Sequence, residues 1–221
     1  MDKENLVGSL EDSLTENMFD TVGDLAEVGL DAVMDDGVLK EIPLLSTVAG
    51  IYKIGHTIKE RHTIKQLALF VTELNKGCVD KNKTNRILEK LNGNQQQSKQ
   101  EIEYILVVLD SYLEYEKPKM LAKLYMAYLE QRIGWTEFLM YAAILRTLLP
   151  QDVRILQSHD FNAGALICMQ MDSASWLRLL SAGFVYEQGV MRFNDDISKN
   201  HDLDVPYSIT KFGQKFIDIV G

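Results

Sequence analysis

The sequence predicts a mainly α fold, a helical bundle with a small C-terminal winged-helix-like α/β module. Apolar residues recur every three or four positions through most of the chain, which is the period of amphipathic helices. The C-terminal part instead reads as a short helix, a β-rich stretch and a final helix. These two observations divide the chain into an acidic helical arm (1–36), a helical bundle (37–157) and the winged-helix-like module (158–221).

The acidic arm is the first predicted helix, and its apolar stripe comprises Leu6, Leu10, Leu14, Met18, Val22 and Leu25. Residues 1–36 hold 11 acidic residues against one lysine, whereas residues 37–98 hold 10 basic residues against five acidic ones. Opposite charges in adjacent segments predict that the arm folds back on the basic region. Two alternatives stay open: the arm shields the basic region until a partner displaces it, or it is merely solvated.

Prolines, glycines and capping residues predict where the helices of the bundle begin and end. Pro43 suits the first turn of a helix that extends to about Leu74 with a break near Lys59, and a short helix then ends near Asn92. The polar run 94–100 predicts a loop or a frayed turn. Three further helices are predicted over 101–116, 118–134 (opened by Pro118) and 136–149 (capped by Thr136 and stopped by Pro150).

The C-terminal module begins with a helix over 173–183 that ends at a glycine. A hairpin arm over 184–193, a strand over 205–210 and an amphipathic helix over 210–221 follow. Helical spacing places Trp176 with Leu179 on one face and Phe212 with Phe216 on another, which predicts a small core. If that face is exposed, Trp176, Phe212 and Phe216 form a docking module for a partner.

The segment 43–58 is the most informative stretch for function. One side of its helix is apolar and the other carries small residues, and the candidate membrane or interface residues are Leu44, Leu45, Val48, Gly50, Ile51 and Tyr52. A constitutive membrane span is disfavoured, because Lys53 and His56 interrupt the segment before the roughly 20 apolar residues that a span needs. A buried bundle helix and a helix that enters a membrane or lines an oligomer both remain open.

Basic residues after this segment raise the question of nucleic-acid binding. The candidate basic patch comprises Lys53, Lys59, Arg61 and Lys65. The winged-helix-like end nevertheless argues against DNA, because the helix over 173–183 offers one arginine among leucines and a tryptophan. A protein partner or self-association is therefore the predicted interaction.

Catalytic, metal and targeting motifs are missing from the sequence. His56 and His62 are not spaced as ligands on one helix, and no phosphate loop or nucleophile elbow occurs. We therefore predict no enzyme activity, no cofactor and no metal. The two cysteines without a CxxC spacing and the N-terminus without a signal peptide predict a cytoplasmic protein, with peripheral association at the inner membrane as the alternative.

Three stretches resemble a group of small bacterial proteins that are themselves similar to the abortive-infection alpha type of phage-defence protein. They are IPLLSTVAGIYKIGHTIKERHTIKQLALFVTEL, KPKMLAKLYMAYLEQRIGWTEFLMYAAIL and LLSAGFVYEQ with YSITKFGQKFIDIV. The resemblance covers about residues 38–220 and consists of helix-packing patterns, so it implies a bacterial antiviral or toxin-like role and transfers no catalytic residue.

Two functions follow from these predictions. The first is a non-enzymatic defence protein that acts on a membrane or a partner through the amphipathic helix of segment 43–58. The alternative is a cytoplasmic adaptor or regulator that binds a protein through its C-terminal module.

Overall fold

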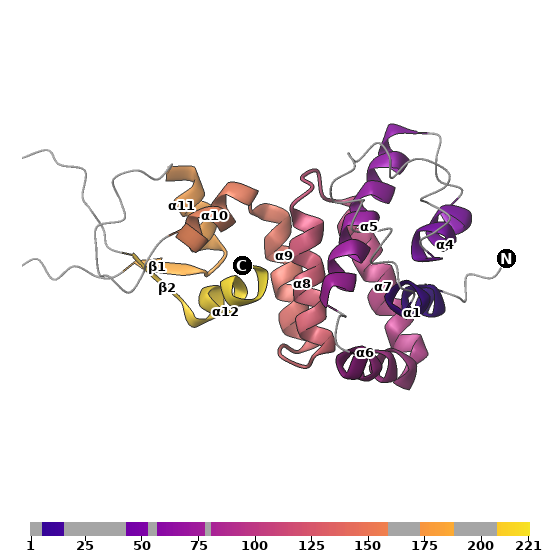
Figure 1. Ribbon diagram of the computed structural model, residues 1–221. Coiled ribbons are helices and arrows are strands. Elements are labelled where there is room, and N and C mark those ends of the chain that lie inside the picture. Colours follow the sequence, from indigo (N-terminus) through magenta and orange to yellow (C-terminus); the bar gives the residue numbers. More distant parts are fainter. Residues whose placement is uncertain (1–5, 16–42, 53–56, 78–80, 159–172, 188–206) are drawn as a thin grey trace, which may run out of the picture. The chain divides into compact units, whose positions relative to one another are not determined.

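The computed structural model describes residues 6–15, 43–52, 57–77, 81–158, 173–187 and 207–221. These residues form ten helices and one two-stranded sheet (Figure 1). The prediction of a mainly α protein is therefore confirmed. The chain divides into two compact units, Met1–Ala142 and Ala143–Gly221, and the division falls within α9 (Trp135–Thr147).

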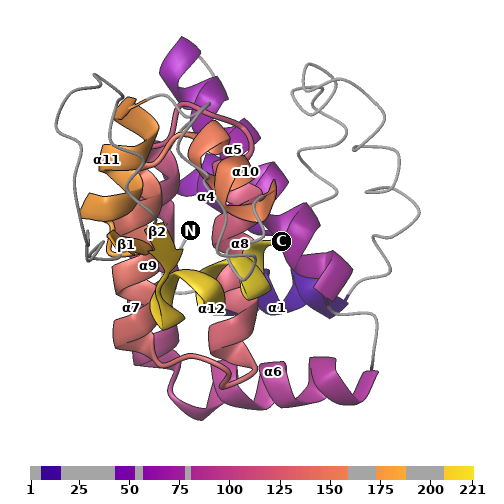
Figure 2. The same ribbon diagram turned by 90° about the vertical axis from the view of Figure 1, so that its left-hand side faces the viewer.

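The first unit is a bundle whose central helix is α5 (Ile58–Gly77). Helix α5 packs against α7 (Gln95–Asp110) and α8 (Lys117–Leu129), while α6 (Lys81–Gly93) lies across one end of the bundle (Figure 2). Helix α1 (Leu6–Thr15) packs on α4 (Pro43–Tyr52) and also on α5, α6 and α7. The described part of the acidic arm therefore lies against the bundle.

Aromatic side chains fill the centre of this unit. The ring of Tyr125 lies 6.1 Å from that of Phe70 and 5.7 Å from that of Phe138, so it links α5, α8 and α9. All three residues are fully buried, as is Tyr141. The aromatic spacing of α8 and α9 is thus a core pattern, and a buried aromatic ring contributes a large apolar area.

A reciprocal cap explains the break predicted near Lys59. The hydroxyl of Thr57 accepts a hydrogen bond from the backbone N–H of Glu60 at 3.2 Å, and the Glu60 carboxylate accepts one from the Thr57 N–H at 3.0 Å. This arrangement is a capping box, which starts a helix at the following residue. Helix α5 accordingly begins at Ile58.

Two predictions on either side of residue 101 are wrong. The run 94–100 was predicted as a loop or a frayed turn, but residues 95–100 belong to α7 and Asn94 caps this helix by accepting from the Gln97 N–H at 3.2 Å. Glutamine and lysine are good helix formers once a cap is in place. The helix predicted over 101–116 ends at Asp110 instead, and the carbonyl of Tyr112 then bonds the ring of His62 at 2.7 Å.

The starts of α8 and α9 test the two remaining cap predictions. Pro118 lies in the first turn of α8, as predicted. Thr136 does not cap α9, because this helix begins one residue earlier at Trp135 and the Phe138 N–H bonds the carbonyl of Gly134 at 2.9 Å.

The second unit contains α10 (Pro150–Ser158), α11 (Ser173–Ser181), β1 (Val185–Glu187), β2 (Tyr207–Ile209) and α12 (Lys211–Val220). Strands β1 and β2 pair antiparallel, with Tyr186 opposite Ser208. The second half of the predicted hairpin arm lies outside the described residues. Helix α10 packs against α11 and α12, and α11 packs against β1. Gly183, at a φ of +70°, ends α11 in the left-handed conformation that glycine adopts readily.

Candidate functional site

The apolar side of α4 faces the interior of the first unit. Leu44, Leu45 and Val48 are buried, whereas Gly50 on the other side is exposed. Ile51 belongs to α4, but its side chain and that of Tyr52 lie outside what the structure describes. The described apolar face is therefore core in this structure.

Serine hydroxyls of α1 hold α4 in place. The Ser13 hydroxyl accepts a hydrogen bond from the Leu44 N–H at 2.9 Å, so α1 supplies a cap for the first turn of α4. Ser9 and Thr47 share a second hydrogen bond of 2.6 Å between their hydroxyls. The contact between these helices thus combines an apolar core with two polar bonds.

The candidate basic patch is only partly basic in the structure. The ammonium of Lys59 lies 3.0 Å from the Asp110 carboxylate, and Asp110 also accepts from the Thr63 hydroxyl at 2.7 Å. Arg61 is exposed, Lys65 is half-buried and Lys53 lies outside the described residues. An ion pair within the patch reduces the positive potential that phosphates require.

The candidate docking residues of the second unit are mostly core. Trp176, Leu179 and Phe216 are buried, and the ring of Phe184 lies 4.6 Å from that of Phe216 and 5.6 Å from that of Phe212. Phe212 is half-buried. The prediction that these side chains are core is confirmed for the three buried residues, which leaves little of their surface for a partner.

The exposed side of α11 is apolar instead. Leu177 is 62% exposed and Leu180 is 38% exposed, and they share a face of the helix. The other exposed side chains described on α11 are Ala174 and Ser181, so none of its exposed residues carries a charge. Tyr186 on the neighbouring strand β1 is also about half exposed.

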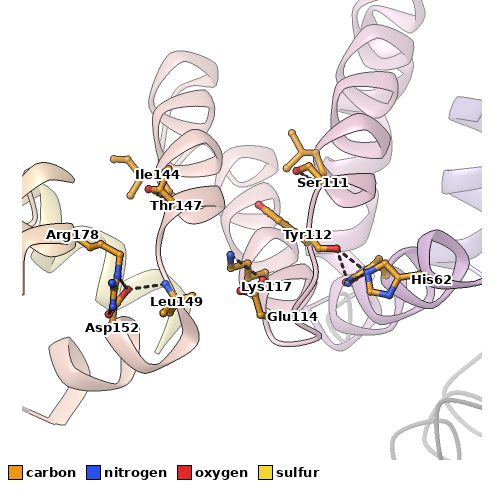
Figure 3. A network of polar contacts seen from close by, with 12 residues as sticks. His62, Ser111, Tyr112, Glu114, Lys117, Ile144, Thr147, Leu149, Asp152 and Arg178 are labelled. Atoms are coloured by element: carbon orange, nitrogen blue, oxygen red, sulfur yellow. Dashed lines mark hydrogen bonds and ion pairs between the residues drawn. The ribbon is translucent and has the colours of Figure 1, made fainter. Parts of the chain in front are cut away.

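A buried ion pair fixes α11 to α10. Asp152 is fully buried and accepts from Arg178 Nε at 2.7 Å and Nη2 at 2.8 Å, and also from the Leu149 N–H at 2.7 Å (Figure 3). Burial raises the pKa of Asp152, but the hydrogen bonds from Arg178 and Leu149 outweigh it and hold this pKa below its ordinary value. The only arginine of α11 is therefore committed to the fold.

The first unit contains a buried group of polar side chains that was not predicted from the sequence. Glu101 on α7 is 4% exposed, and its Oε1 accepts from the Tyr128 hydroxyl at 2.6 Å and from Gln97 Nε2 at 2.8 Å. Lys90 of α6 donates to the Tyr128 carbonyl at 2.7 Å, and its ammonium lies 3.4 Å above the ring of Tyr128. These contacts join three helices around one tyrosine.

The surroundings of this tyrosine alter its acidity and that of the lysine. Burial, with the adjacent Glu101 carboxylate, raises the pKa of Tyr128, which therefore stays protonated and remains a donor. Burial also lowers the pKa of Lys90, against the attraction of Glu101. The Lys90 ammonium bonds the Tyr128 carbonyl at the C-terminal end of α8, where the helix dipole favours a cation.

Two hollows adjoin this group. A pocket of about 150 Å³ is lined by Lys90, Leu91, Gly93, Asn94, Gln97, Ser98, Glu101, Tyr128 and Leu129. A larger groove of about 920 Å³ shares Lys90 and Leu129 with it and adds Asn82, Arg86, Ile87, Glu89, Glu130 and Gln131. Gln131 has a φ of 61°, a left-handed conformation that is uncommon for a residue other than glycine.

The sequence contained one signal of this site. Glu101 precedes Ile105 by four residues, and Ile105 is followed by Leu109 at the same spacing, so a helical wheel places Glu101 on a buried face. The prediction of a loop over 94–100 hid this register, because Gln97 and Ser98 were not assigned to the same helix.

The residues that the structure describes contain neither a cluster of metal ligands nor a helix that could span a membrane. Histidine, cysteine, aspartate and glutamate side chains nowhere gather in threes as a metal site requires within the described ranges, and His62 bonds the Tyr112 carbonyl (Figure 3). None of the described helices combines the length and the hydropathy that crossing a membrane requires. Comparison with protein-family models, with curated proteins and with solved structures gives no match.

Proposed function

We propose that this chain is a non-catalytic binding protein that docks a partner protein through the exposed face of α11. The observation that carries the proposal is the contrast along one helix. Trp176 and Leu179 fill the core of the second unit, whereas Leu177 and Leu180 face solvent, and the one charged residue of the helix, Arg178, is paired with Asp152. An exposed apolar face of this kind gains free energy when a partner covers it.

The occupant that fits this face is an amphipathic helix of another protein, because two leucines one helical turn apart interdigitate with an apolar helix stripe. Nucleic acid fits less well, since Arg178 is bound to Asp152 and offers no guanidinium to a phosphate. In this proposal the second unit is winged-helix-like, with α11 as its exposed helix and β1 and β2 as the base of its wing.

Site-specific photo-crosslinking in the cells that carry the chain tests this proposal. A photoreactive residue at position 177 should give a discrete adduct with one other protein, and the same residue at exposed Gln214 on α12 should not. The double substitution Leu177→Glu and Leu180→Glu should remove binding of the protein identified in this way. Equal adducts at both positions would refute docking through α11, and an adduct of twice the chain's mass would replace the partner with a second copy.

A second candidate function is supported by the contact between α1 and α4. In this proposal the chain is a defence protein in a bacterial, antiviral setting, and α4 acts on a membrane after α1 releases it. The apolar face of α4 that would enter the membrane is continuous over Leu44, Leu45 and Val48, and the α1 side of the contact includes the hydroxyls of Ser9 and Ser13. Hydroxyl contacts exchange readily with water, unlike an entirely apolar seam.

Substituting Ser13 tests this candidate. Ser13→Ala removes the cap on the Leu44 N–H and should increase both growth arrest on expression and sedimentation with anionic vesicles. Ser46 is exposed on α4, so Ser46→Ala makes the same chemical change away from the contact and is the matched control. Unchanged vesicle binding by a folded Ser13→Ala protein would contradict the release of α4.

A further inference from the structure

The pocket between α6, α7 and the end of α8 contains a carboxylate oxygen that no described residue satisfies. Both donors that reach Glu101, the Tyr128 hydroxyl and Gln97 Nε2, bond its Oε1. The structure gives Oε2 no hydrogen bond and no ion pair with any described residue. Because Glu101 is 4% exposed and lines the pocket, Oε2 has the pocket as its source of donors. Water in the pocket can donate to this oxygen, and a ligand ammonium would replace water with a charged donor, which forms a stronger hydrogen bond.

A cation lies on the other side of the same tyrosine. One N–H of Lys90 bonds the Tyr128 carbonyl and the ammonium lies over the ring, which leaves further donor capacity on an ammonium with three N–H groups. Lys90 is not within ion-pair distance of Glu101, so the two charges remain separate poles. Arg86, one turn before Lys90 on α6, adds a second cation in the adjoining groove.

These two poles select the charge of the ligand. A simple cation at Glu101 would meet the Lys90 ammonium, and a simple anion at Lys90 would meet the Glu101 carboxylate, so each loses part of its attraction to repulsion. A molecule with an ammonium and a carboxylate on one short skeleton complements both poles. The pocket, at about 150 Å³, has room for a small head group, and the adjoining groove of about 920 Å³ has room for more of a ligand.

We propose that this pocket binds a small zwitterion of the amino-acid class. Glu101 Oε2 accepts from the ligand ammonium, Lys90 and Arg86 receive its carboxylate, and the side chain of the ligand extends into the larger groove. Tyr128 and Gln97 are positioning residues, because they hold Oε1 and thereby direct Oε2. This inference is independent of docking through α11, which lies in the other unit.

The test uses the full-length protein and each proteinogenic L-amino acid in turn, first by thermal shift and then by calorimetry. We expect at least one amino acid to bind. Its N-acetyl derivative lacks the ammonium and its amide lacks the carboxylate, and each should bind roughly ten- to a hundredfold more weakly, the loss that one charged hydrogen bond brings. Absence of binding by every amino acid, or equal binding of a capped derivative, would overturn the proposal.

Two variants locate the binding. Glu101→Gln keeps the shape of the side chain and should weaken binding of the free amino acid by a similar factor, without affecting the N-acetyl derivative. Glu103→Gln is the matched control, because it makes the same change on the exposed side of α7. Lys90→Met should weaken binding of the amino acid and leave binding of its amide unchanged. Unchanged affinity in folded Glu101→Gln protein would refute the site. If that variant fails to fold, the affinities of the N-acetyl derivative and the amide for the wild-type chain test the proposal instead.

Discussion

The ion pair between Asp152 and Arg178 makes a quantitative test of how the second unit is held together. Asp152→Asn preserves the shape of the side chain but removes the charge, and its amide N–H₂ would face a donor, either of Arg178 or of the Leu149 backbone. Breaking one side of a buried ion pair typically costs about 3–5 kcal/mol. Because the Arg178 side chain is 27% exposed and water partly solvates it afterwards, we expect the lower end, about 3 kcal/mol.

Tryptophan fluorescence during denaturation measures this cost in the right unit. The chain has two tryptophans, Trp135 and Trp176, so Trp135→Phe leaves Trp176, on the same helix as Arg178, as the reporter. In that background Asp152→Asn should lower the unfolding free energy by about 3 kcal/mol near neutral pH. Asp218→Asn is the control, and this exposed residue with one surface hydrogen bond should change stability by less than about 0.5 kcal/mol.

The same measurement has a pH dependence with a defined sign. The folded-state pKa of Asp152 is depressed, because the Arg178 and Leu149 donors outweigh the effect of burial. Its stabilisation is therefore fully present above the unfolded-state pKa of about 3.9 and disappears as the pH falls through the lower folded-state pKa. The difference in unfolding free energy between the Trp135→Phe protein and the same protein with Asp152→Asn should become smaller below about pH 4. A difference under about 0.5 kcal/mol near neutral pH, or one that becomes larger in acid, would refute a stabilising ion pair between Asp152 and Arg178.

Two further substitutions test the packing of the second unit. A Cβ at Gly213 would lie 2.4 Å from the Phe184 carbonyl oxygen, so Gly213→Ala should cost at least about 1–3 kcal/mol in thermal unfolding; Gly93→Ala, with open space around it, should be neutral or gain up to about 1 kcal/mol. Phe216→Ala removes a fully buried ring and should cost about 3–5 kcal/mol by denaturant unfolding, whereas an unchanged midpoint would show that its face is not core.

Helix boundaries were predictable where the backbone itself imposes them. Pro118 lies in the first turn of α8 and Gly183 ends α11, because proline lacks an N–H and glycine accepts a left-handed φ. Pro150 was predicted only as the stop of the preceding helix, and the helix α10 that begins there was not predicted. Residues 111–116 were wrongly predicted to continue a helix, since their local preferences allow one. The structure instead buries Tyr112 and bonds its carbonyl to His62, and tertiary contacts of this kind override propensity.

The sequence predicted which candidate site residues share a face of a helix, but not whether that face is exposed or covered by another helix. Helical spacing correctly placed Leu44 with Val48 on one face, but it contains no information about α1, the helix that packs on α4. Lys59 was grouped with neighbouring cations because its partner Asp110 is distant in sequence. The pocket at Tyr128 requires three helices to meet, and no single-helix pattern describes such a meeting.

The pairing of charges determines which partner the exposed surfaces favour. Lys59 is bound to Asp110, Lys117 to Glu114 and Arg178 to Asp152, so these cations are neutralised within the fold. Binding to nucleic acid weakens steeply with salt, because each phosphate contact releases counterions. Docking through Leu177 and Leu180 buries apolar area and involves no charged residue of α11, so its affinity should change little with salt. The salt dependence of a purified complex therefore distinguishes an apolar docking face from an electrostatic one, whichever protein the partner is.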